Sequence, residues 1–144
     1  MRSVLVVSSI LCLSLSSCVS VIHHDEHAAA NAATQFANAA FIEHDFSKAR
    51  ELMASEPAQQ LSAEGLADVV TKMHQDSYPT QVAATDFEPM PGQRAMMIYL
   101  KGENDGAVFH YRFVMEGDQT AGYRVSGLFR GEAPYPSPNK RPLR

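Results

Sequence analysis

The stretch AVFHYRFVME, residues 107–116, decides the fold. Apolar and polar side chains alternate along it, with one set of residues on each face: Phe109, Tyr111, Phe113 and Met115 against His110, Arg112 and Glu116. Side chains of a β-strand point alternately to the two faces of its sheet. The period of two therefore predicts a strand with one face buried in a core.

Three further segments flank this strand and are predicted to pair with it. They cover residues 81–88, 94–101 and 123–130, and within the second of them Met96, Ile98 and Leu100 alternate with Met97 and Tyr99. Turn residues fill the connections, at 89–92, 102–106 and 117–122. Consecutive strands joined by short loops pair as an antiparallel meander.

The N-terminal half of the chain has a helical period instead. Five apolar side chains form one stripe at i, i+3, i+4, i+7 and i+8, which predicts a first helix: Ala33, Phe36, Ala37, Ala40 and Phe41. Asp45 is the expected N-cap of a second helix, which ends near Met53, and Ser62 that of a third. We expect a break around Pro57. Helices that precede strands predict an α+β domain, with three helices packed on one face of a curved sheet.

Two segments resemble the nuclear transport factor 2-like fold, a cone-shaped, cystatin-like α+β fold. The segment FIEHDFSKA, residues 41–49, is similar to the break between that family's first two helices, although His44 stands where glycine is usual. The segment GYRVSGL, residues 122–128, is similar to its last strand. The resemblance covers residues 28–130 and implies a cone between helices and sheet. The fold is found in isomerases, dehydratases, hydrolases and binding or assembly modules, so it does not determine the function.

The first 17 residues have the pattern of a secretory signal peptide. Arg2 precedes an apolar run over residues 4–15, which is shorter than the roughly 20 residues of a membrane-spanning helix. The ending LSSC, residues 15–18, resembles the lipobox of bacterial lipoproteins, which implies cleavage before Cys18 and acylation of that cysteine. Val19 follows it, and in that family this favours the outer membrane. We therefore expect a lipid-anchored protein of the bacterial envelope, facing the periplasm.

Composition excludes several classes of function. The chain has 144 residues, with 12 basic and 16 acidic side chains and a net charge of −4. This mildly acidic balance argues against nucleic acid as a partner. Cys12 leaves with the signal peptide and Cys18 takes the lipid, so no thiol remains for a disulfide or for catalysis. The sequence contains neither a glycine-rich phosphate loop nor a G-x-S-x-G motif, and we expect no cofactor.

The two ends of the predicted domain carry polar segments. Residues 18–27 are predicted to be the lipidated cysteine and a solvated tether. The tether contains three histidines, His23, His24 and His27, and histidine is a ligand for zinc, copper and nickel. A tether offers no second layer of residues to orient these side chains, so we expect no metal site. Residues 131–144 are rich in proline and carry Lys140, Arg141 and Arg144. They are predicted to be an extended, mobile tail without strand pairing.

Two classes of function remain open. The first is a non-enzymatic binding or assembly module that holds a partner protein, a second copy of the chain or a small apolar ligand on its sheet face. That face would present one of two sets of residues: Phe109, Tyr111 and Phe113, or else His110 and Arg112. The second is a small enzyme with an acid-base site in the cone, because an apolar pocket shifts the pKa of a phenol or carboxyl group. Its candidate residues are Tyr99, Tyr111 and Asp86.

Overall fold

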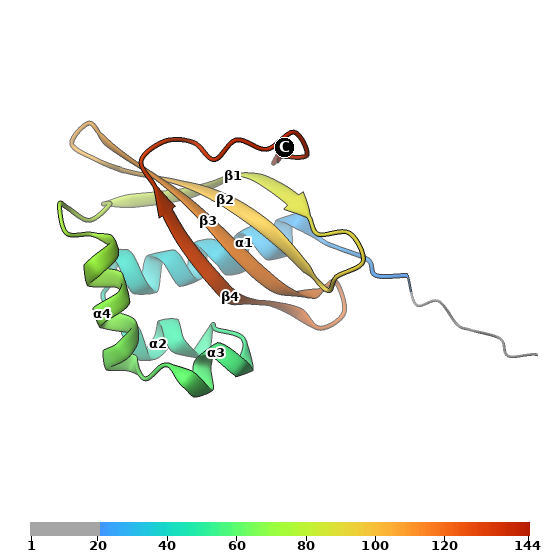
Figure 1. Ribbon diagram of the computed structural model, residues 1–144, viewed down its shortest axis with the longest axis horizontal. Coiled ribbons are helices and arrows are strands. Elements are labelled where there is room, and N and C mark those ends of the chain that lie inside the picture. Colours follow the sequence, from blue (N-terminus) through green and yellow to red (C-terminus); the bar gives the residue numbers. More distant parts are fainter. Residues whose placement is uncertain (1–20) are drawn as a thin grey trace, which may run out of the picture.

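The computed structural model describes residues 21–144 (Figure 1). Cys18 and the predicted signal peptide lie outside the described residues. Helices come first and strands follow, which confirms the α+β class. The helices are α1 (Glu26–Ala37), the π-helical η1 (Asn38–Ile42), α2 (Phe46–Glu51), α3 (Ser55–Gln60) and α4 (Ala63–Met73). Within the described part of the chain, no helix is both long and apolar enough to span a membrane.

The strands form one open antiparallel sheet. They are β1 (Gln81–Pro89), β2 (Ala95–Asn104), β3 (Ala107–Asp118), β4 (Gly122–Gly131) and β5 (Arg141–Pro142). Their order in the sheet is β4-β3-β2-β1-β5. The predicted meander of four strands is therefore confirmed, and a fifth short strand extends it. The β3–β4 hairpin needs glycine at position 117, where φ is +135° and a Cβ would lie 1.8 Å from the carbonyl oxygen of Gly122.

Two predicted helix starts are confirmed, and the predicted number of helices is wrong. The side chain of Asp45 accepts a hydrogen bond from the Lys48 amide (3.0 Å), and that of Ser62 accepts one from Gly65 (3.1 Å). The residues 21–144 contain four α-helices rather than three, because α3 occupies the predicted break. Pro57 is the third residue of α3, where the missing N–H would have no partner within the helix.

The core lies between the helices and one face of the sheet. Figure 1 shows α1 running along the sheet, with α2, α3 and α4 gathered on the β4 side. Phe36 and Phe41 are fully buried, and their rings meet that of Phe113 edge-on at 5.6 and 6.0 Å. Aromatic rings from η1, α1 and β3 thus join the two layers.

The N-terminal segment is more ordered than a tether. Helix α1 already begins at Glu26, because the Asp25 side chain accepts a hydrogen bond from the Ala28 amide (2.9 Å). The Asp25 amide donates to the Tyr123 hydroxyl (2.8 Å), and the His24 ring lies 3.3 Å from the same oxygen. The prediction of a solvated spacer up to residue 27 therefore fails for this stretch, which packs on the β3–β4 hairpin.

The proline-rich tail also folds back onto the sheet. Arg141 and Pro142 form β5 opposite Phe87 and Asp86 of β1, which contradicts the expected absence of strand pairing. The Leu143 amide then donates to a carbonyl of β1 (3.0 Å). Proline is tolerated here because β5 is an edge strand, where a missing donor can face solvent.

Candidate ligand cleft on the outer sheet face

The sheet separates the predicted site residues onto its two faces. Phe109, Tyr111 and Phe113 point toward the helices and are at most 1% exposed. The ring of Phe41 lies 4.9 Å from that of Tyr111. Aromatic side chains therefore fill this part of the predicted cone, and the apolar face expected to bind a ligand or partner is the protein's own core.

The hydroxyl of Tyr111 meets a histidine that the sequence analysis missed. It donates to His74 Nε2 (2.7 Å), and Nδ1 of the same ring donates to the carbonyl of Val70 (2.8 Å). Burial raises the pKa of Tyr111 and lowers the pKa of His74, which is 3% exposed. Both groups are therefore neutral at neutral pH, and the pair is a hydrogen bond of the core. The available signal was the position of His74, one turn after Val70 on the apolar stripe of α4.

The buried His74 predicts a pH-dependent stability. Because its pKa is lower in the folded chain than the ordinary 6.5, the unfolded chain binds the proton more readily. The stability is then complete above pH 6.5 and falls below it, by at most about 1.4 kcal/mol per pH unit. We expect the thermal midpoint to fall from pH 7.5 to 5, and to fall less in His74→Gln. Equal falls in the two proteins would contradict the assignment.

Other predicted site residues lie on the outer face, away from the helices. Asp86, Tyr99 and Arg112 are neighbours across β1, β2 and β3 in the strand register. Lys101 and His110 are paired two residues further along β2 and β3. The sheet thus brings Asp86, Tyr99, His110 and Arg112 together on its outer face. The three predicted acid-base residues do not share a site, because Tyr111 lies on the opposite face of the sheet from Tyr99 and Asp86.

The tail forms a wall over this outer face. The guanidinium of Arg112 lies between the rings of Phe129 and Tyr135, 4.9 Å from each centroid. Lys140 Nζ lies 5.1 Å from the centroid of the Tyr99 ring and donates to the carbonyl of Tyr135 (3.1 Å). These contacts with Arg112 and Tyr99 hold the tail against the sheet.

The Tyr99 hydroxyl is engaged by a carboxylate. It donates to Glu88 Oε2 at 2.7 Å, and Glu88 is 9% exposed. Burial and this hydrogen bond raise the pKa of Tyr99 to about 12, while the Tyr99 hydroxyl holds the pKa of Glu88 below its usual range. Tyr99 is therefore a neutral hydrogen-bond donor that is already in use.

A cleft of about 340 Å³ opens between the tail and the outer face. Side chains from β1, β2, β3 and the tail line it: Asp86, Tyr99, Lys101, His110, Tyr135 and Lys140. Gly131 lies beside His110 in the register, and a Cβ there would be 3.1 Å from the Tyr135 ring. The absence of a side chain at Gly131 therefore lets Tyr135 close one side of the cleft.

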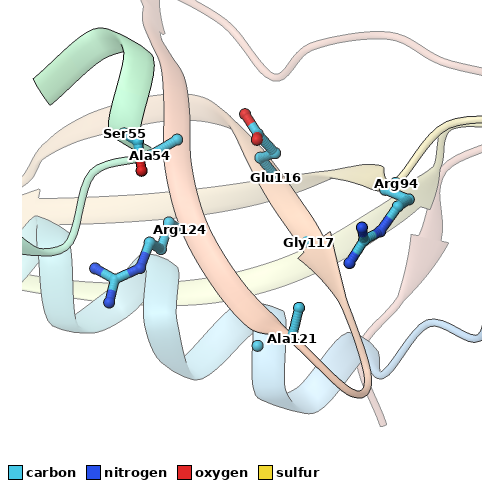
Figure 2. Close-up of a pocket in the computed structure, with 8 residues that line it drawn as sticks. Ala54, Ser55, Arg94, Glu116, Gly117, Ala121 and Arg124 are labelled. Atoms are coloured by element: carbon cyan, nitrogen blue, oxygen red, sulfur yellow. The ribbon is translucent and has the colours of Figure 1, made fainter. Parts of the chain in front are cut away.

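A second hollow lies at the β3–β4 hairpin (Figure 2). It measures about 230 Å³ and is bordered by Arg94, Glu116 and Arg124. Figure 2 shows the two arginines on different sides of the hairpin, and each has a partner. Arg94 forms an ion pair with Asp118 (2.7 Å), and Arg124 donates to the carbonyl of Glu51. None of the predicted site residues borders this hollow.

The structure gives the three tether histidines no shared ligand geometry. Across residues 21–144 there is no group of three or more His, Cys, Asp or Glu side chains arranged to hold a metal ion. His24 contacts Tyr123 instead, and His23 and His27 are exposed.

Neither a protein-family model, nor a curated protein, nor a solved structure matches the chain. The geometry of the outer cleft is therefore the main evidence on function.

Proposed function

We propose that this protein is a lipid-anchored protein of the bacterial envelope that binds a small ligand in the outer cleft. The LSSC ending at Cys18 supports the lipid anchor, and Val19 supports an outer-membrane location facing the periplasm. The order of helices and strands is compatible with the nuclear transport factor 2-like fold that the sequence resembles.

The cleft is the observation that carries the binding function. Its volume of about 340 Å³ lies within the range of small-molecule sites. Tyr135 and Pro134 supply apolar wall, and polar groups converge from three strands. Within residues 21–144, the side chains of Asp86 and His110 take part in no hydrogen bond or ion pair, so both are available to a ligand.

Binding is better supported than catalysis. A general acid or base works best when its pKa lies near the operating pH. The pKa of Tyr99 is raised to about 12, and its hydroxyl already donates to Glu88. Tyr111 donates to His74 inside the core. The enzyme alternative needs a tyrosine hydroxyl that is free to exchange a proton with a substrate. The hydroxyl groups of Tyr99 and Tyr111 are both already hydrogen-bonded within the protein.

A fragment screen tests this function. We expect small aromatic fragments to shift the amide resonances of β2, β3 and the tail in NMR spectra of the isotope-labelled full-length chain. Tyr135→Ala removes one wall and should weaken the best fragment at least about tenfold. Val108→Ala is the control, because this residue of β3 is 45% exposed and does not line the cleft.

Two outcomes of the screen would contradict the proposal. Shifts centred on the hollow of Figure 2 would move the site to the β3–β4 hairpin. Fragments that shift no resonance of the cleft would favour the other reading of the sheet face, a surface for a partner protein or a second copy of the chain.

A further inference from the structure

We propose that the ligand of the outer cleft is a small organic monoanion with an apolar body, such as an aromatic carboxylate. This inference rests on the proposed binding function and adds the chemical class of the ligand. It follows from the charges that line the cleft, from the register of two strands and from the apolar wall of the tail.

The charge of the cleft is opposite to that of the chain. Lys101 and Lys140 line it together with His110 and one acidic side chain, Asp86. The chain as a whole carries a net charge of −4. The residues that line the cleft thus include two lysines and one aspartate, and this excess of positive charge favours a negatively charged ligand over a cation.

The strand register places two of these groups side by side. Lys101 and His110 are opposed on β2 and β3, and opposed residues have Cβ atoms roughly 4.5–5.5 Å apart. Lys101 Nζ has one ion-pair partner, Glu103 Oε1 at 2.5 Å, whereas His110 has none within the described chain. A carboxylate between them would accept hydrogen bonds from both the ammonium and the imidazole.

The remaining lining residues limit the charge and shape of the ligand. Asp86 on the β1 side repels a second negative charge, which argues against polyanions such as nucleotides. Pro134 and Tyr135 give the opposite wall an apolar surface, whereas the Tyr99 ring is already in contact with Lys140. The apolar body of the ligand is therefore placed against the tail and its anionic group against β2 and β3.

Calorimetric titration with three probes tests this class. Benzoate, benzamide and inorganic phosphate are each titrated into the full-length chain in a nonionic detergent. We expect benzoate to bind at least about tenfold more tightly than benzamide, which has the same shape without the charge, and more tightly than phosphate, which has no apolar body.

Charge variants locate the effect. Lys101→Met keeps the apolar stem and removes the charge, and we expect it to weaken benzoate about tenfold while leaving benzamide unchanged. Lys72→Met on α4, outside the cleft, is the matched control and should leave both affinities unchanged.

The outcomes separate this inference from the proposed function. Equal affinities for benzoate and benzamide, unaffected by Lys101→Met, would overturn the anion class but leave the cleft as a binding site. Phosphate binding as tight as that of benzoate would overturn the apolar body. If none of the probes binds while aromatic fragments also fail to shift the cleft resonances, the proposed function itself fails.

Discussion

Replacing Phe41 with alanine is expected to lower the free energy of unfolding by about 3–5 kcal/mol. Phe41 is fully buried at the junction of η1 with the sheet. Its ring contacts those of His74 at 4.7 Å and Tyr111 at 4.9 Å, and it meets Phe36 edge-on at 6.4 Å. Truncation leaves a cavity between two elements of fixed position, which the surrounding rings cannot close.

Urea unfolding followed by circular dichroism measures this loss. The free energy of unfolding falls by about 1–3 kcal/mol per molar urea, so a loss of about 4 kcal/mol lowers the midpoint by about 2 M. Phe129→Ala removes the same atoms from a side chain that is 45% exposed on the outer face, and it should cost about 1 kcal/mol or less. Similar losses in the two variants would show that the Phe41 cluster is not the centre of the core.

The local features of this fold were predictable from the sequence. Asp45 and Ser62 are N-caps because their short side chains accept hydrogen bonds from amides three residues later. The alternation around Phe113 fixed both the strand and its buried face, since a shift by one residue would expose every apolar side chain. These signals lie within a few residues of the position they determine.

The composition of the cleft was not predictable in the same way. Alternation assigns Tyr99 and Ile98 to opposite faces of β2, but only the pairing of β2 with β1 and β3 puts Asp86 and Arg112 beside Tyr99. Tyr135 and Lys140 lie in a proline-rich segment without periodicity. Their positions depend on cation–π contacts and on two residues of strand pairing, which no local pattern encodes.

The docked N-terminal segment links the proposed anchor to the orientation of the domain. The carbonyl of His23 accepts a hydrogen bond from the Gln119 amide (2.9 Å), and Asp25 is held by Tyr123. Only four residues separate Cys18 from His23, and an extended chain gains at most about 3.6 Å per residue. A lipid on Cys18 would therefore hold the β3–β4 hairpin near the membrane surface.

Cys18→Ser is expected to move nearly all of the protein from the membrane fraction to the soluble fraction. Serine cannot form the thioether through which a lipoprotein cysteine is attached to its lipid. Stable anchoring needs more than a single acyl chain, so a protein that carries only one chain would also appear in the soluble fraction. Cell fractionation measures the distribution, and mass spectrometry of the N-terminal peptide measures the lipid.

The chain contains its own control for this experiment. Cys12 lies within the apolar run and leaves with the signal peptide if cleavage precedes Cys18. Cys12→Ser should therefore leave both the membrane fraction and the N-terminal lipid unchanged. If Cys18→Ser stays in the membrane with its N-terminal run intact, the segment acts as an uncleaved anchor. If instead both variants remain membrane-bound after cleavage, the attachment lies elsewhere in residues 18–144, and the outer face of the sheet becomes the first place to search for it.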